Sequence, residues 1–307
     1  MKKYYRIKLG RRSAHADVCK RERFIGADFS MQFSFEGNLP ENWRDFNKHY
    51  IPKYLDSHPG KSKIAAGLAC GALHTVCKGI KLGDIILSPD GGGNYLIGEV
   101  KGDYFYKQGK ILPHRRNMLW YPKTVSRSSM SQALQYSTGS IGTVSNVTKY
   151  AEEIEELISD NRPQKIISSD ETIEDPSVFA LEKHLEDFLV KNWSNTALGK
   201  KYNIYEEDGE LVGQQYLSDT GPIDILALSK DNKEILVLEL KKGRASDSVI
   251  GQIQRYMGYV KDELCEDNQI VRGIIIALDD DLKIRRALSV AQNIDFYRYK
   301  IDFKLIK

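Results

Sequence analysis

Two charged side chains of opposite sign occur within an apolar segment in the second half of the chain, where residues 234–242 read EILVLELKK. Apolar and β-branched residues flanked by polar turn residues predict a buried strand. Side chains two residues apart on a strand share a face, so Glu239 and Lys241 are expected on one face and Leu240 on the other. Burying such charges costs free energy unless they are paired or bind a metal ion, so the pattern indicates a functional site.

A second carboxylate, Asp224, lies in the preceding apolar segment, IDILALS, and the turn-like residues SKDNKE separate the two segments. A hairpin of these strands would bring Asp224 near Glu239. Two adjacent carboxylates repel unless a cation lies between them, and such oxygen ligands suit Mg²⁺, with Mn²⁺ as a substitute. A bound Mg²⁺ can hold a phosphate and acidify water, and Lys241 would orient that water or stabilise the pentavalent phosphate.

A helix predicted at SDSVIGQIQRYMGYV carries Gln252, Arg255 and Tyr256, which lie three and four residues apart on one stripe. Gln252 can bond a metal ligand or a phosphate, and Arg255 suits phosphate or DNA binding. An ordinary amphipathic helix with a solvated polar stripe is the alternative.

The segments GPIDILAL, VLELKKGRA and GQIQRYMGYV together resemble the PD-(D/E)xK nuclease superfamily, and within it the C-terminal domain of endonuclease NucS and Mrr-like relatives. The resemblance covers about residues 176–265. It implies Asp224, Glu239 and Lys241 as the catalytic trio, with Gln252, Arg255 and Tyr256 in support. An inactive copy of the site is the alternative.

The same resemblance implies a further glutamate in the metal site, contributed by the first helix of the nuclease domain. The segment DPSVFALEKHLEDFLVKNW is predicted to be that helix. Glu182 is the expected ligand beside Asp224 and Glu239, and Glu186, one turn later on the same face, is the second choice. A solvated helix face is the alternative for both.

Charge is distributed unevenly along the chain. Residues 1–150 hold 24 Lys and Arg against 11 Asp and Glu, residues 151–175 hold 2 against 9, and residues 176–307 hold 19 against 22. A basic front half suits a module that binds a polyanion, because neutralised phosphates release counterions. The alternative is a basic surface with no partner.

The run GDIILSPDGGGNYLIGEVKGDYFY, followed by LPHRRNMLWYP, resembles the PUA-like modules called EVE domains, which are small barrels. That resemblance implies an aromatic-walled pocket for a flipped or modified base, for which Trp43, Tyr104 and Trp120 are the candidates. Arg115 and Arg116 would hold the adjacent backbone phosphates. The alternative is that most of these aromatic rings fill the barrel.

The predicted fold class is α/β (α+β), with a PUA/EVE-like, β-barrel-containing module at residues 1–158 and a restriction-endonuclease-like mixed sheet flanked by helices at residues 176–307. An acidic stretch at residues 159–175, without hydrophobic periodicity, is the predicted linker. No run of about 18 apolar residues predicts a membrane span, the N-terminus lacks an apolar signal core, and four cysteines lack CxxC spacing, which together predict a cytoplasmic protein.

These patterns predict a Mg²⁺-dependent endodeoxyribonuclease that binds double-stranded DNA with modified or flipped bases, which would suit modification-dependent restriction of foreign DNA. The NucS resemblance implies a different activity as the alternative, a repair endonuclease acting on mismatched or branched DNA. A third reading is a non-catalytic DNA-binding defence protein. Because cutting both strands needs two active sites, a homodimer is expected.

Overall fold

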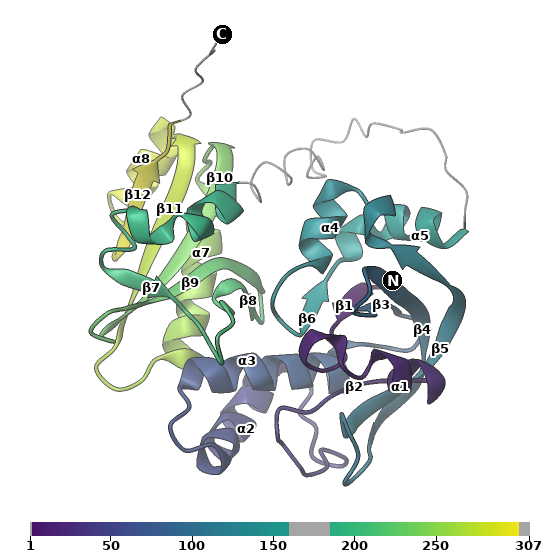
Figure 1. Ribbon diagram of the computed structural model, residues 1–307. Coiled ribbons are helices and arrows are strands. Elements are labelled where there is room, and N and C mark those ends of the chain that lie inside the picture. Colours follow the sequence, from purple (N-terminus) through teal and green to yellow (C-terminus); the bar gives the residue numbers. More distant parts are fainter. Residues whose placement is uncertain (1, 160–184, 301–307) are drawn as a thin grey trace. The chain divides into compact units, whose positions relative to one another are not determined.

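The computed structural model describes residues 2–159 and 185–300, and the chain divides into two compact units, residues 1–173 and 174–307 (Figure 1). Each unit is described by itself. Almost all of the predicted linker at 159–175 falls outside the described residues, so its two boundaries stay predictions. None of the helices in the described ranges is long and apolar enough to cross a membrane.

The first unit is built on a six-stranded mixed sheet whose strands are ordered β2-β5-β4-β3-β1-β6. Only the β1–β3 pair is parallel among the pairs in this sheet. The strand bounds are β1 Tyr4–Ile7, β2 Phe24–Ala27, β3 Ile85–Pro89, β4 Asn94–Tyr106, β5 His114–Ser126 and β6 Val144–Asn146. The sheet is thus mixed as predicted, while its likeness to a PUA or EVE barrel stays a prediction.

The glycine-rich segment between β3 and β4 forms a tight turn, as its sequence predicts. The Asp90 carboxylate accepts hydrogen bonds from the backbone N–H groups of Gly92 at 2.7 Å and Asn94 at 3.0 Å. A side chain that binds its own backbone two residues later fixes the turn locally. The turn therefore sets the register in which β3 and β4 pair.

The helices of the first unit are α1 Ala16–Arg21, α2 Trp43–Ser57, α3 Lys63–His74, α4 Gln132–Thr138 and α5 Ala151–Ser159. Side-chain oxygens cap the two longest at their N-termini, Asn42 for α2 and Ser62 for α3. Gly71 lets these two helices approach closely, because a Cβ there would lie 2.2 Å from the ring of Trp43. The small residues of α3 therefore serve close helix packing.

The second unit contains a mixed sheet ordered β12-β11-β10-β9-β7, with β8 also paired to β9. The β10–β11 and β11–β12 pairs are parallel and the others are antiparallel. The strand bounds are β7 Tyr202–Ile204, β8 Gln214–Ser218, β9 Gly221–Ser229, β10 Glu234–Arg244, β11 Ile270–Asp279 and β12 Ile294–Arg298. A mixed α+β fold, predicted from the sequence, is confirmed in both units.

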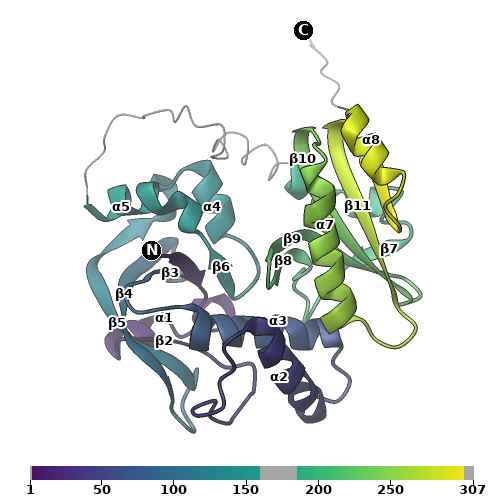
Figure 2. The ribbon, with the colours of Figure 1, turned by 180° about the vertical axis from the view of Figure 1, so that it is seen from behind.

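The parallel strand pairs require crossover connections, and helices supply them. Helix α7 Ser248–Tyr259 connects β10 to β11, and α8 Leu282–Leu288 connects β11 to β12 (Figure 2). Helix α7 packs closely on β11, since a Cβ at Gly273 would lie 2.6 Å from Met257 Sδ and 3.0 Å from Ile253. One face of the sheet is therefore covered by α7.

The opposite face of this sheet carries a separate apolar cluster that includes Leu236, Leu238 and Leu240 of β10 together with Trp193. Helical residues 185–191 contribute Leu185 and Leu189 to its edge. The predicted alternation along β10 is thereby confirmed, with leucines on this face and the two charged residues on the face of α7. Shorter 3-10 or π turns occur at Arg11–Ser13, Thr75–Gly79, Arg127–Ser129, Thr148–Tyr150, Trp193–Asn195 and Val260–Leu264.

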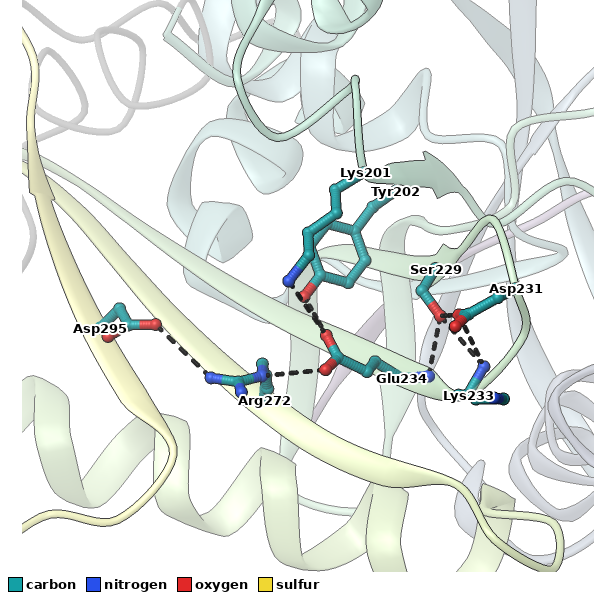
Figure 3. A network of polar contacts seen from close by, with 8 residues as sticks. All are labelled: Lys201, Tyr202, Ser229, Asp231, Lys233, Glu234, Arg272 and Asp295. Carbon is teal, nitrogen blue, oxygen red and sulfur yellow. Dashed lines mark hydrogen bonds and ion pairs between the residues drawn. The ribbon is translucent and has the colours of Figure 1, made fainter.

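A polar network ties together the start of β10 and its neighbours (Figure 3). The Glu234 carboxylate accepts hydrogen bonds from the Tyr202 hydroxyl and from Arg272 Nε at 3.3 Å, and Arg272 lies 3.9 Å from Asp295. Ser229 closes the preceding turn by accepting the backbone N–H of Glu234 at 2.8 Å. The network spans β7, β10, β11 and β12, and so fixes the end of β10 that is distant from Lys241.

Candidate active site

Asp224 lies where strand β9 separates from β10. The antiparallel register pairs Val237 with Leu226 and Leu238 with Ile225, and one further step in this register would pair Glu239 with Asp224. The backbone ladder stops there, and Asp224 Oδ2 accepts the backbone N–H of Leu240 at 2.8 Å instead. The predicted hairpin therefore brings Asp224 beside the Glu239 segment.

Glu239 and Lys241 lie together on the α7 face of β10. Glu239 is only 1% exposed, and its Oε1 lies 3.0 Å from Lys241 Nζ. The Lys241 side chain retains about a quarter of its exposure (25%). The carboxylate is therefore held inside while the ammonium group lies between it and solvent.

A buried acidic residue on the first helix of the unit joins this site through two amide side chains of β8. Glu186 is 3% exposed, and its two carboxylate oxygens accept from Gln214 Nε2 and Gln215 Nε2, each at 2.6 Å. Gln215 Nε2 also donates to Asp224 Oδ1 at 3.0 Å. Glu186, the second choice from the sequence, therefore lies beside Asp224. Glu182, the first choice, falls outside the described residues.

Helix α7 places Tyr256 beside the predicted catalytic trio. Burial raises the pKa of its phenol, the charges of Glu239 and Asp224 raise it further, and Lys241 and a hydrogen bond from Gln252 lower it. All four groups thus act on one hydroxyl, which Gln252 Nε2 approaches at 3.4 Å. The phenol therefore stays protonated at neutral pH and can donate a hydrogen bond.

Gly221, at the start of β9, gives the Tyr256 hydroxyl its space. Its φ of +132° lies in the region that favours glycine, and a Cβ there would approach the Tyr256 Oη to 3.2 Å. The conformation of β9 and the position of the tyrosine are therefore coupled.

The predicted stripe on α7 is divided between the interior and the surface. Gln252 is half-buried and Tyr256 buried, whereas Arg255 is exposed and its guanidinium lies back along the helix towards Gly251. Gln252 contacts Tyr256, and Tyr256 in turn lies beside the predicted trio. The predicted role of Arg255 in binding DNA stays a prediction.

The sequence predicts a hairpin at residues 202–219 that brings Gln214, Gln215 and Tyr216 toward the site, but it does not predict which groups the two amides contact. Gln214 Nε2 also donates to Asp187 Oδ1 at 3.0 Å. Two consecutive residues of a regular strand point to opposite faces, so both amides converging on one helix was not expected. The left-handed conformation of Gln215, with φ of +54°, makes this convergence possible.

The oxygen-rich set formed by Glu186, Asp224 and Glu239 suits the chemistry of Mg²⁺, which prefers carboxylate ligands. Within residues 2–159 and 185–300, no three His, Cys, Asp or Glu side chains already form a metal cluster. Hydrogen-bond donors instead lie between the acids, since Gln215 joins Glu186 to Asp224 and Lys241 contacts Glu239. The residues fit the ion in chemical type, and binding would require these donors to move.

In the first unit, Arg115 and Arg116 are buried, at 2% and 4% exposed. Arg115 bonds the carbonyl oxygens of Leu112 at 3.1 Å and Ile111 at 2.6 Å, and its guanidinium lies 3.7 Å from the centre of the Phe24 ring. Because burial is the largest influence, the pKa of each guanidinium is lowered.

Arg116 uses its guanidinium in the same way, donating to the carbonyl oxygens of Val76 at 2.7 Å, Cys77 at 2.5 Å and Gly102 at 3.2 Å. Donors already bonded to buried backbone oxygens are not available to DNA phosphates. This geometry contradicts the prediction for Arg116, whose Nε, Nη1 and Nη2 all bond backbone carbonyl groups, whereas the role of Arg115 stays a prediction.

The three aromatic residues predicted to wall a base pocket pack in separate places. Trp120 Nε1 donates to the Cys19 carbonyl at 3.0 Å, and Tyr104 Oη accepts the Phe35 backbone N–H at 3.1 Å. Both rings pack against the apolar core. Trp43 lies against Gly71 in the α2–α3 contact. These contacts favour the alternative, in which the rings pack against the interior, and the base pocket stays a prediction.

A different hollow, of about 620 Å³, lies on one face of the first sheet. The register pairs Phe24 with Asn117 and Phe105 with Arg115, which places these four residues on the same face. Three cations and one acid take part in its lining, which consists of Glu22, Phe24, Phe105, Lys107, Lys110, Arg115 and Asn117. Lys107 and Lys110, both exposed, stand at the β4–β5 connection. The hollow is thus basic and accessible.

Comparison with known proteins places the second unit near one nuclease family. Residues 182–301 match the family described as the endonuclease NucS C-terminal domain. Endonuclease NucS of Methanocaldococcus jannaschii is 33% identical over 96 residues, which cover 31% of this chain and 35% of that protein. The protein of the same name from Pyrococcus horikoshii is 36% identical over 103 residues, 33% of this chain and 39% of its own length.

The chain thus matches little more than a third of the length of these relatives. Two solved structures have a TM-score of 0.32: an EndoMS–dsDNA2 complex, 14% identical over 72% of this chain and 66% of its own, and a repair endonuclease from Pyrococcus abyssi, 16% identical over 69% and 66%. TM-scores this low carry no structural argument, so the relationship rests on the sequence matches alone. The predicted likeness of the second half to NucS is confirmed, and the matched segment contains Asp224, Glu239, Lys241 and Tyr256.

Proposed function

We propose that this protein is a metal-dependent DNA endonuclease whose active site lies at the junction of β9, β10 and α7. The supporting observation is that Asp224 accepts the backbone N–H of Leu240 at 2.8 Å, directly between Glu239 and Lys241, whose side chains lie 3.0 Å apart, within the segment that matches the NucS C-terminal domain. The named relatives are endonucleases. The activity of the whole chain is inferred from this part of it.

Each side chain of the site has a distinct task in phosphodiester hydrolysis. A bound Mg²⁺ would supply a Lewis acid for the phosphate and a bound water of lowered pKa. Asp224 and Glu239 would hold that ion, with Glu186 in support. Lys241, whose side chain is 25% exposed, would donate a hydrogen bond to the attacking water or to the phosphate as negative charge develops.

Tyr256 is suited to positioning rather than proton transfer. Its raised pKa keeps the hydroxyl protonated, so it can donate to an oxygen of the site over the whole neutral range. Gln252, which approaches the same hydroxyl, would orient it.

Among the predicted substrates, the sequence matches favour repair. The prediction of a repair endonuclease acting on mismatched or branched DNA was based on the resemblance to NucS. The family match extends over residues 182–301 and supports that resemblance. Restriction of modified DNA rested on the front half, to which the family match does not extend, and on a base pocket that the separate contacts of Trp43, Tyr104 and Trp120 do not favour. We therefore adopt the repair reading.

The first unit would hold the DNA through its basic hollow rather than through Arg116. Lys107 and Lys110 are exposed and lie at the edge of that hollow, where a phosphate can approach both. Phosphate contacts fix the position of a protein on DNA without reading its sequence. Cutting both strands would need two such chains, so we propose a homodimer on DNA.

Incubation of purified protein with Mg²⁺ and matched sets of duplexes tests this function. The duplexes are perfectly paired, mismatched, forked and methylcytosine-containing, with otherwise identical sequence. Cleavage of the mismatched or forked duplexes, lost in Glu239→Ala, is the expected outcome. Cleavage restricted to the modified duplex would reinstate restriction, and binding without cleavage in both Mg²⁺ and Mn²⁺ would indicate a non-catalytic protein.

A further inference from the structure

Strand β8 presents two consecutive amide side chains to a cluster of acids. Gln214 donates to Glu186 and Asp187, and Gln215 donates to Glu186 and Asp224. The amide of Gln215 is thus the group that joins the first helix of the unit to strand β9. Its nitrogen lies 2.6 Å from Glu186 Oε2 and 3.0 Å from Asp224 Oδ1.

The backbone is strained to place this amide. Gln215 has φ of +54°, a left-handed conformation that costs a non-glycine residue of order 1 kcal/mol. The preceding Gly213 lies so close to β9 that a Cβ there would approach the Leu226 carbonyl oxygen to 2.3 Å. Gly213 and the left-handed residue together direct both amides towards the same acids.

The Gln215 amide offsets the electrostatic repulsion between Glu186 and Asp224. Two carboxylates at this separation repel each other, and the interaction is strong because Glu186 is 3% exposed. The two N–H bonds of one amide nitrogen can point to two different oxygens, so a neutral group satisfies both acids. The same two carboxylates, Glu186 and Asp224, would hold a divalent cation.

We propose that Gln215 is a placeholder for the metal ion: its amide holds Glu186 and Asp224 together in the metal-free protein and must release them when the ion binds. The inference rests on the proposed metal-dependent nuclease and assigns a positioning residue to its site. It follows that Gln215 stabilises the metal-free state at the expense of metal affinity.

The test measures Mg²⁺ binding, not cleavage. Thermal unfolding and isothermal titration calorimetry are carried out with Mg²⁺ alone on wild type and Gln215→Ala. We expect the variant to unfold at a lower temperature without Mg²⁺, to gain more in Tm when Mg²⁺ is added, and to bind Mg²⁺ at least about tenfold more tightly, the equivalent of one of the two hydrogen bonds that the amide makes to charged groups.

Two further variants separate this role from ordinary stability. Gln215→Gly also removes the amide but relieves the positive φ, so it should fold at least as well as Gln215→Ala and show the same tighter binding. Gln269→Ala removes a glutamine whose amide bonds the Asn232 carbonyl at 2.8 Å, away from the acids. It should leave Mg²⁺ affinity at the wild-type value.

The outcomes distinguish the inference from the function on which it rests. Wild type that binds Mg²⁺, with Gln215 variants that bind it equally or more weakly, overturns the placeholder and leaves the metal site standing. Wild type that shows neither heat nor a rise in Tm with Mg²⁺ or Mn²⁺ overturns both.

Discussion

Glu239 is the residue on which the charge balance of the site depends. It is 1% exposed and has Lys241 Nζ at 3.0 Å, on a strand whose other face is packed with leucine. A buried carboxylate held this way resists rearrangement, because removing one partner leaves an uncompensated charge. Its position is therefore maintained by packing on one side and by charge on the other.

Glu239→Gln should abolish cleavage while leaving DNA binding within about twofold of wild type, since the amide preserves shape but removes the metal-binding charge. Rates are measured by single-turnover cleavage of a forked duplex and affinity by fluorescence anisotropy. Because the glutamine leaves Lys241 without its anionic partner, circular dichroism serves as the folding control. A variant that cuts at the wild-type rate would refute the assignment.

Gly221→Ala is expected to destabilise the second unit by about 1–2 kcal/mol, because its φ of +132° is strained for alanine. The added Cβ, 3.2 Å from Tyr256 Oη, should also slow cleavage by displacing the hydroxyl. Gly209→Ala, at a φ of +78° with open space around it, is the matched control. It should lose similar stability but retain the wild-type cleavage rate in chemical denaturation and single-turnover assays.

At the scale of elements, the strand pattern and turn chemistry could be predicted, whereas the contacts of β8 could not. The alternation of leucines and charged residues along β10 predicted the faces on which Leu240 and Glu239 lie. The turn residues from Ser229 to Glu234 predicted the hairpin that carries Asp224. The convergence of Gln214 and Gln215 depends on one left-handed residue, which no periodicity reveals. Arg116 was misassigned because a cluster of arginines looks the same in sequence whether it binds phosphates or buried carbonyl groups.

Glu234→Gln should destabilise the protein by about 1–2 kcal/mol at pH 7, with a smaller loss at pH 3. Hydrogen bonding from Tyr202 is the main cause that lowers the pKa of Glu234, with Arg272 contributing, and burial opposes it. A carboxyl group with a lowered folded-state pKa contributes stability above its unfolded pKa and loses it as pH falls. Urea unfolding at both pH values measures the difference.

Asp295→Asn is the control for the same network. Asp295 lies 3.9 Å from Arg272 and both side chains are substantially exposed, so the pair is screened by solvent. Its loss should change stability by less than about 0.5 kcal/mol at either pH. An equal effect of the two substitutions would contradict the role given to the Tyr202 hydrogen bond.

At the scale of the whole molecule, the two units differ in net charge. Residues 1–173 carry +8 (26 basic against 18 acidic), while residues 174–307 carry −5 (19 against 24). A basic unit that binds the polyanion would raise the local concentration of DNA for an acidic catalytic unit that repels it in the absence of metal.

Lys107→Glu with Lys110→Glu should weaken DNA binding and reduce the salt dependence of log Kobs by up to about 2, since each lost phosphate contact accounts for about 0.9. Lys3→Glu with Lys48→Glu makes the same change in net charge at exposed positions outside the lining of the hollow. Anisotropy titrations at several salt concentrations compare the two pairs. Equal losses would mean that overall charge, and not the hollow, binds DNA.

The order of contacts along the chain also bears on how the second unit folds. The β8–β9 and β9–β10 hairpins close over short turns, whereas the parallel strand β11 pairs with β10 only after the α7 crossover. Asp224 and Glu239 therefore meet early, before β11 can complete the sheet beside Glu239. Refolding of this unit should accelerate when divalent ions are present or when mild acid neutralises the pair, a kinetic signature of a site assembled around its own repulsion.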